Sequence, residues 1–270
     1  MTKFEMQVKT TALEAAEKAA KIVLDNLGKI KSGGIETKRQ FDFVTHVDLE
    51  SERTIIETIR QQFPDHDFHA EEQGEDARTS EFQWIIDPLD GTTNYIHNFP
   101  CFCISIALQK NGETLFGLVR DPLRNECFSA LKGEGAFSNE APISVSTETD
   151  FSRALIATGF PFRDKSKMEV YLSSFAEVMR NVAGIRRAGS AAIDLCYVAS
   201  GRLDGFWEIG LHAWDIAAGI LILSEAGGVT TDFIGEKNYF KTGNVVAANL
   251  NLHPELLAIC KDKLAGVYMP

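Results

Sequence analysis

The chain has 270 residues and a formal charge of −11, and 44% of its residues are hydrophobic while 24% are charged. This is the composition of an ordinary globular protein, and no apolar run approaches the roughly 18 residues of a membrane span. Direct nucleic-acid binding is not expected, because it draws on clustered Lys and Arg and this acidic chain has no basic run. The N-terminus does not resemble a signal peptide, since Glu5, Glu14 and Glu17 interrupt its apolar positions.

The first half of the chain predicts helices followed by strands. Residues 5–27 repeat apolar side chains at helical spacing and end near Gly28. A second helix is expected from about Asp48 to Phe63, where Pro64 stops it. Short apolar runs separated by turn signals predict strands at 84–86, 102–108, 115–120 and 126–131.

After about residue 145, strands and helices alternate. The strands are expected at 154–158, 205–208 and 245–248, and the helices at 168–182, 191–199, 214–226 and 254–264. Residues 216–223 are apolar on almost all helix faces, so this helix should be buried. We therefore expect an α/β chain in two halves, residues 1–144 and residues 145–270, with mixed sheets and packed helices.

The cysteines predict a reducing environment. There are five of them, an odd number, and no CxxC pair occurs. Small buried thiols in a cytoplasmic protein are the expected outcome, rather than a disulfide framework or a metal site.

The most informative stretch is Trp84-Ile-Ile-Asp-Pro-Leu-Asp-Gly-Thr-Thr-Asn94. A buried strand ends at Asp87, Pro88 forces a bend, and Asp90 opens a turn into a helix, so both carboxylates can face one point. Amides at the start of that helix would favour an anion. Carboxylates for a hard cation beside amides for a phosphate are what metal-assisted phosphate hydrolysis needs. An Asp-Pro turn followed by an N-cap is the alternative for a shorter string.

Further segments of the chain belong with this string, because all of them occur in the same order in one known protein family. They are Asp42-Phe-Val-Thr-His-Val-Asp48, His69-Ala-Glu-Glu72, Gly189-Ser-Ala-Ala192, Trp214-Asp215 and Glu225-Ala-Gly-Gly228. With the string at 84–94, this set resembles the inositol monophosphatases, within the lithium-sensitive, magnesium-dependent phosphatase superfamily. The resemblance implies a layered αβαβα sandwich of the inositol monophosphatase and fructose-1,6-bisphosphatase type, and a homodimer.

The resemblance also implies two to three Mg²⁺ ions and a role for each matching residue. Glu71, Asp87 and the carbonyl of Leu89 would hold the first ion, and Asp87, Asp90 and Asp215 the second. Catalytic roles fall to Asp48, Thr92 and Glu71, with Asp48 and Thr92 activating a water. The implied substrate contacts are Asp90, Gly91, Thr92, Gly189, Ser190, Ala191, Glu208 and Asp215.

Several of these residues also have a purely structural interpretation. Asp48 could cap the helix that follows it, Asp215 could interact with a helix dipole, and Glu208 could be a surface carboxylate. Histidine and cysteine ligands, which would favour zinc, are absent from the sequence cluster.

The sequence thus predicts a magnesium-dependent phosphomonoesterase acting on myo-inositol monophosphate. The alternatives keep the chemistry and change the substrate to fructose 1,6-bisphosphate, a 3′-phosphoadenosine nucleotide or NADP. A hypothesis of another class is a regulatory interaction protein that retains the fold. No membrane association is expected.

Overall fold

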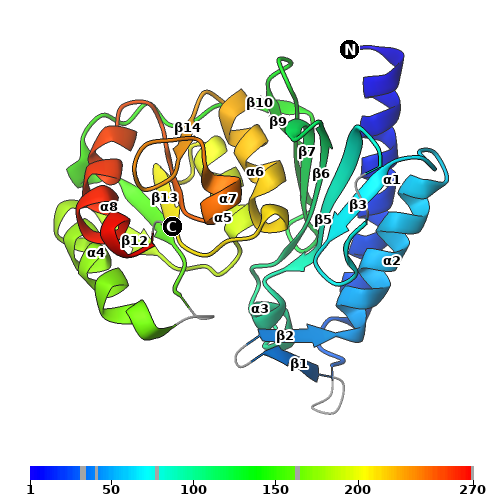
Figure 1. Cartoon of the computed structure of the whole chain (residues 1–270), viewed down its shortest axis with the longest axis horizontal. Coiled ribbons are helices and arrows are strands. Elements are labelled where there is room, and N and C mark those ends of the chain that lie inside the picture. The colour runs from blue at the N-terminus through cyan, green and yellow to red at the C-terminus, as the bar shows by residue number, and fades with distance from the viewer. Residues whose placement is uncertain (31–34, 40–41, 77–78, 162–164, 269–270) are drawn as a thin grey trace.

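Two large β-sheets and three layers of helices make up the main body of the structure, a computed structural model (Figure 1). It describes residues 1–30, 35–39, 42–76, 79–161 and 165–268. The layers follow the order helix, sheet, helix, sheet, helix, so the expected αβαβα sandwich is confirmed. None of the described helices is long and apolar enough to cross a bilayer.

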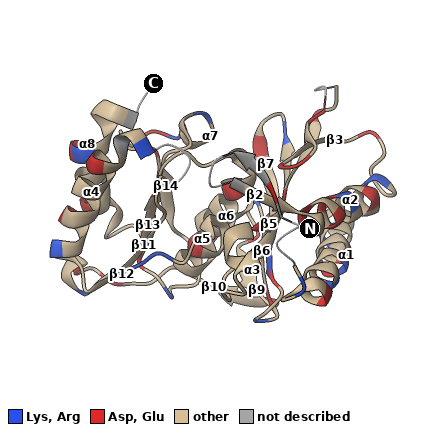
Figure 2. Cartoon of the chain, turned by 90° about the horizontal axis from the view of Figure 1, so that it is seen from below, with Lys and Arg blue, Asp and Glu red and all other residues tan. Residues whose placement is uncertain are grey.

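The outer helices on the N-terminal side are α1 (Lys3–Asn26) and α2 (His46–Arg60), which pack against each other and on the first sheet. Thr2 and Glu5 form a capping box at the start of α1. Alanines on one stripe of α1, from Ala12 to Ala20, are buried and allow this close packing. Basic and acidic residues are interspersed along both helices (Figure 2).

The first sheet has eight strands in the order β10-β9-β8-β7-β6-β5-β3-β4. Only the β3–β5 pair is parallel among the described pairings of this sheet. The strands are β3 (Asp67–Ala70), β4 (Gly74–Glu75), β5 (Phe82–Asp90), β6 (Cys103–Lys110), β7 (Glu113–Asp121), β8 (Glu126–Leu131), β9 (Ala136–Ser138) and β10 (Ala141–Ile143).

The second sheet has five strands in the order β12-β11-β13-β15-β14. They are β11 (Leu155–Thr158), β12 (Gly184–Arg186), β13 (Gly205–Glu208), β14 (Val229–Thr231) and β15 (Val245–Ala248). Helices α4 (Met168–Asn181) and α8 (His253–Tyr268) cover its outer face. The division near residue 144, proposed from the sequence, falls between β10 and β11.

The middle layer consists of α5 (Ala191–Ala199) and α6 (Ala213–Glu225). Residues 216–223 of α6 are buried, as their apolar character predicted. At Gly117 on β7, an added Cβ would lie 2.8 Å from the Ala218 carbonyl oxygen, so the glycine lets α6 lie directly on the sheet. The two sheets therefore share one central core.

Successive side chains along a strand point to opposite faces of the sheet and pack into different hydrophobic cores. Ile85 faces the central core, while Trp84 and Ile86 face α1 and α2. In β13, Phe206 points to the central core and Trp207 to the layer of α4 and α8. This period of two fixes which residues at the strand ends can reach a common point.

Smaller elements complete the chain around the site. The hairpin β1 (Ile35–Arg39) and β2 (Asp42–Thr45) leads into α2, and α3 (Thr92–Ile96) follows β5 directly. Helix α7 (Tyr239–Thr242) and the 3₁₀ turns Phe151–Arg153 and Lys165–Lys167 lie in the second half.

Candidate active site

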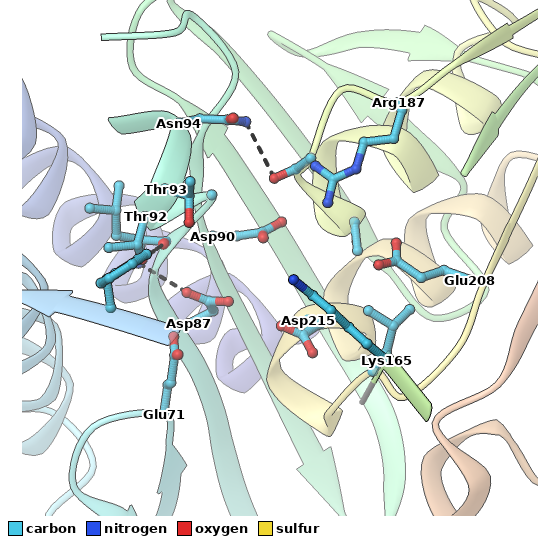
Figure 3. A pocket seen from close by; sticks show the side chains of 16 residues that line it. Glu71, Asp87, Asp90, Thr92, Thr93, Asn94, Lys165, Arg187, Glu208 and Asp215 are labelled. Carbon is cyan, nitrogen blue, oxygen red and sulfur yellow. Dashed lines mark hydrogen bonds between the residues drawn. The ribbon is translucent and has the colours of Figure 1, made fainter. Parts of the chain in front are cut away.

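The string at 84–94 runs along β5 into α3 and forms one wall of a cavity of about 340 Å³. Both halves of the chain contribute to the lining (Figure 3). The lining residues that carry the argument below are Glu71, Asp87, Asp90, Thr92, Glu208 and Asp215.

A bulge in β5 brings Asp87 and Asp90 to one side. The pairing of β5 with β6 shifts register between these two residues, at Pro88, which cannot donate to a sheet ladder. The amide of Leu89 donates to Asp87 Oδ1 at 3.0 Å and holds the turn. The bend expected from the sequence is therefore present within the strand.

Asp215 joins these two carboxylates from the opposite half. It lies in the first turn of α6, where its Oδ2 accepts a hydrogen bond from the His212 amide at 2.6 Å. One carboxylate oxygen from each of Asp87, Asp90 and Asp215 lies within 4.8 Å of the others. The side chain thus both caps its helix and completes an acidic cluster.

The cluster has the chemistry of a hard-cation site. Burial raises the pKa of Asp87 well above its usual range, and the neighbouring carboxylates of Glu71, Asp90 and Asp215 raise it further. These donors are all oxygens, which suit Mg²⁺ better than zinc. The residues fit a divalent cation, because its charge would offset the mutual repulsion of the carboxylates.

Glu71 enters the cavity from the loop after β3, and this loop is fastened by a residue that the sequence did not single out. Glu52 of α2 is buried, and its two carboxylate oxygens accept from the amides of Glu72 and Gln73, each at 2.8 Å. The Glu71 amide donates to the Ile86 carbonyl at 3.2 Å. Glu71 is therefore placed by backbone contacts on both sides.

Asp48 lies behind Thr92 rather than in the cavity lining. Its Oδ1 accepts from the Thr92 hydroxyl at 3.0 Å, and its Oδ2 accepts from the amide and hydroxyl of Thr45 at 2.9 and 2.6 Å. The N-cap of α2 is Thr45, so the interpretation of Asp48 as the N-cap is wrong; Asp48 is the third helical residue of a capping box. Burial raises the pKa of Asp48, which strengthens it as a proton acceptor.

Gly91 allows the chain to turn from β5 into α3. Its φ is +94°, and an added Cβ would lie 2.8 Å from the Cys101 carbonyl oxygen. Only glycine fits this left-handed position against neighbouring backbone. The amides of Gly91 and Thr92 consequently lie beside the acidic cluster.

Asp90 connects the two halves of the site. Its Oδ2 accepts from the Ser190 hydroxyl at 2.6 Å and from the Ala192 amide at 2.9 Å, at the start of α5. Ser190 is therefore turned toward Asp90 and lies behind the cavity lining, while Gly189 and Ala191 line it. The seryl contact fixes the orientation of a cluster carboxylate.

Asn94, at the end of the same string, fastens the same two segments through the backbone. Its side-chain amide nitrogen lies 2.7 Å from the Cys101 carbonyl, 2.9 Å from that of Ala188 and 3.3 Å from that of Gly189. The bond to Gly189 joins two residues that line the cavity from different halves of the chain (Figure 3). Asn94 belongs to the string at 84–94, but the sequence did not predict this role for it.

Glu208 ends β13, is buried, and points into the cavity (Figure 3). Burial raises the pKa of Asp194 on α5 well above its usual range, and the carboxylates of Glu208 and Asp90 raise it further. Asp194 lies outside the motifs that the sequence indicated. Phe43, Thr93, Lys165, Arg187 and Leu211 also line the cavity and were not predicted.

The family of the chain follows from comparison with known proteins. The profile of the inositol monophosphatase family matches residues 5–264. The chain belongs to this family. A Nus factor SuhB of Salmonella typhimurium (strain 14028s / SGSC 2262) is 45% identical over 257 residues, which cover 95% of this chain and 96% of that protein.

Solved structures agree with the family and the fold. The extragenic suppressor protein suhB from Bartonella henselae gives a TM-score of 0.92 at 37% identity, over 96% of this chain and 100% of that one. The inositol monophosphatase from Anabaena (Nostoc) sp. PCC 7120 gives 0.85 at 36% identity, over 97% and 99%. The family is one of generally metal-dependent phosphatases, and the acidic cluster of this member lines the cavity.

Proposed function

We propose that this protein is a Mg²⁺-dependent phosphomonoesterase that hydrolyses myo-inositol monophosphate to inositol and phosphate. The observation that carries the proposal is the convergence of Asp87, Asp90 and Asp215, with one oxygen of each within 4.8 Å of the others, in a cavity that Glu71 also lines. Such a cluster is costly unless a cation neutralises it. A phosphate ester is the substrate class that a cation beside backbone amides suits.

Glu71, Asp87 and the Leu89 carbonyl would hold one ion, and Asp87, Asp90 and Asp215 a second, with Glu71 shared by a weaker third. When bound, Mg²⁺ supplies charge neutralisation of the phosphate and a lower pKa for bound water. The amides of Gly91 and Thr92 would bind phosphate oxygens.

The chain's own residues provide a route for the proton. The Thr92 hydroxyl lies 3.0 Å from Asp48 Oδ1 and 3.1 Å from the Leu89 carbonyl, so its single hydrogen can pass to the carboxylate. Thr92 can then accept a proton from an attacking water in the cavity. Asp48 is suited to hold this proton because burial raises its pKa.

The polar side of the cavity would bind the leaving group. Carboxylates accept hydrogen bonds from hydroxyl groups, so Asp90 and Glu208 are placed to bind the hydroxyls of a polyol. Gly189 and Ala191 leave room for a ring, and Ser190 would act through Asp90, whose carboxylate it holds.

Phosphate release from a substrate panel tests the proposal. The panel contains myo-inositol 1-phosphate, fructose 1,6-bisphosphate, 3′-phosphoadenosine 5′-phosphate and NADP, each with and without Mg²⁺. We expect Mg²⁺-dependent release with the inositol phosphate leading, and no turnover by Asp87→Asn. Preference for another compound would move the specificity and keep the chemistry. Full activity of Asp87→Asn would refute the site.

A second candidate function is a surface role in a larger complex. The observation that favours it is the name of the 45% identical relative, which designates a Nus factor and no enzymatic reaction. In a pull-down, the tagged wild-type chain and its Asp87→Asn variant should then retain the same partner protein, and the partner should bind both with equal affinity. Loss of binding in the variant would tie the interaction to the catalytic site.

Homodimeric assembly and a cytoplasmic location also remain proposals. The five cysteines are free thiols, and four of them are buried, which agrees with a reducing compartment. Light scattering of the purified chain would test the dimer directly.

A further inference from the structure

Gly159 and Glu208 lie at equivalent points on two neighbouring strands. Strands β11 and β13 run parallel, with Thr158 opposite Trp207, and Gly159 and Glu208 are the next residues on each. A Cβ added to Gly159 would lie 1.8 Å from Oε1, 1.9 Å from Cδ and 2.2 Å from Oε2 of Glu208. The carboxylate of Glu208 therefore occupies the space of the missing Cβ.

Backbone conformation does not explain this glycine. Gly159 is not among the described glycines with positive φ, so its backbone is accessible to other residues. Gly91, by contrast, combines a φ of +94° with a close backbone contact. At Gly159 the requirement is space for one side chain.

The backbone around Gly159 is held and cannot easily withdraw. The Thr158 hydroxyl lies 2.7 Å from the Trp207 carbonyl and 2.6 Å from the Tyr171 hydroxyl, all of them buried. On the other side, the Phe160 ring meets the Tyr171 ring edge-on, with centroids 5.7 Å apart. The flexible end of Glu208 is therefore the group that would move if a side chain were added.

We propose that Gly159 is a specificity-determining residue that seats the Glu208 carboxylate in the cavity. This inference rests on the proposed phosphatase function and extends it. With glycine at 159, the carboxylate lies against the end of β11 and presents acceptor oxygens to the leaving group. The substrate class this selects is a phosphate monoester whose leaving group carries hydroxyls able to donate to a carboxylate.

The test compares two substrates in three variants. The substrates are myo-inositol 1-phosphate and p-nitrophenyl phosphate, whose leaving group has no additional hydroxyl, both with Mg²⁺. Gly159→Ala should lower kcat/KM for the inositol phosphate by about 10- to 100-fold, the range for losing a hydrogen bond to a charged group. Its kcat/KM for p-nitrophenyl phosphate should change by less than about threefold, because the reacting centre is intact.

The other two variants, Glu208→Ala and the double variant, show whether Gly159 acts through Glu208. Glu208→Ala should give the same substrate pattern, and the double variant should lose no more than Glu208→Ala alone, since the new methyl then enters vacated space. Equal losses on both substrates, or a further loss in the double variant, would show that Gly159 acts through the backbone and overturn the proposal. Unchanged activity of Gly159→Ala on the inositol phosphate would overturn it as well.

Two controls separate this proposal from the others. Gly266→Ala on α8, where no heavy atom lies within 4 Å of the added Cβ, should leave both activities unchanged and establishes the effect of a neutral glycine substitution. A wild-type protein inactive on both substrates would refute the phosphatase function itself. A wild type that hydrolyses only p-nitrophenyl phosphate would refute the role of Gly159 and Glu208 and keep the chemistry.

Discussion

Asp87→Asn should make the metal-free protein more stable while it abolishes turnover. At 4.8 Å, the upper limit on the separation of the cluster oxygens, two full charges repel by about 3.5 kcal/mol at an effective dielectric constant of about 20. Burial and the neighbouring carboxylates raise the pKa of Asp87, because both disfavour its charged form. The asparagine retains the acceptor for the Leu89 amide and removes the charge, so we expect a gain of about 1–3 kcal/mol at pH 8.

The pH dependence has a defined sign. The folded-state pKa of Asp87 is raised, so the folded protein binds more protons than the unfolded chain above the ordinary carboxyl range. This contribution to stability is complete at acidic pH and is lost as pH rises through the raised pKa. The advantage of Asp87→Asn over wild type should therefore grow from pH 5 to pH 8 in EDTA.

Urea unfolding in EDTA and in saturating Mg²⁺ measures both effects. Mg²⁺ at about 100 times its Kd should stabilise the wild type by about 2.7 kcal/mol and should stabilise the variant much less. Asp121→Asn is the matched control, because this buried carboxylate is compensated by the amide and guanidinium of Arg124 at 3.0 and 2.8 Å, and its loss should destabilise. A variant at position 87 that is less stable than wild type in EDTA at pH 8 would refute the electrostatic reasoning.

Three further outcomes follow from the site. Thr92→Val, which removes the hydroxyl 3.0 Å from Asp48, should lower kcat by about 100-fold or more with an unchanged circular dichroism spectrum. Asn94→Ala leaves the backbone carbonyls of Cys101, Ala188 and Gly189 without this donor, so the free energy of unfolding in urea should fall by about 1–3 kcal/mol. Lithium at millimolar concentration should inhibit phosphate release relative to potassium at equal ionic strength, because it would replace the second Mg²⁺ beside Asp90.

Much of the fold could be predicted where caps and glycines mark the element ends. Helix α5 (Ala191–Ala199) begins after the capping residue Ser190, and its predicted bounds agree with the structure, as do those of β8, β13 and β15. Helix α2 begins two residues earlier than expected, because Thr45 is its N-cap. Strands β3, β12 and β14 were not predicted. Each is short and mixes its few apolar residues with polar ones, so it lacks the apolar run that marked β15.

Some residues of the site could be predicted from the local sequence, while others depend on tertiary contacts. The acidic residues of the string at 84–94 could be found because one bend brings them together. Glu52 and Gly159 act on residues far away in the sequence, and no local pattern marks such contacts. Gly159 is the clearest case. The reason for a glycine there is the position of the Glu208 side chain on the neighbouring strand, which only the folded structure reveals.

Cation occupancy and the contact between the two halves are physically linked. Asp90 belongs to the first sheet, but its Oδ2 is held by Ser190 and the Ala192 amide at the start of α5. Asp215 reaches the same cluster from α6. The donors at α5 hold one oxygen of Asp90, while Asp215 brings a second carboxylate to it from α6, so a bound cation would offset the repulsion between carboxylates that the two halves contribute. We therefore expect this site to contribute more to the stability of the fold with a cation bound than without one.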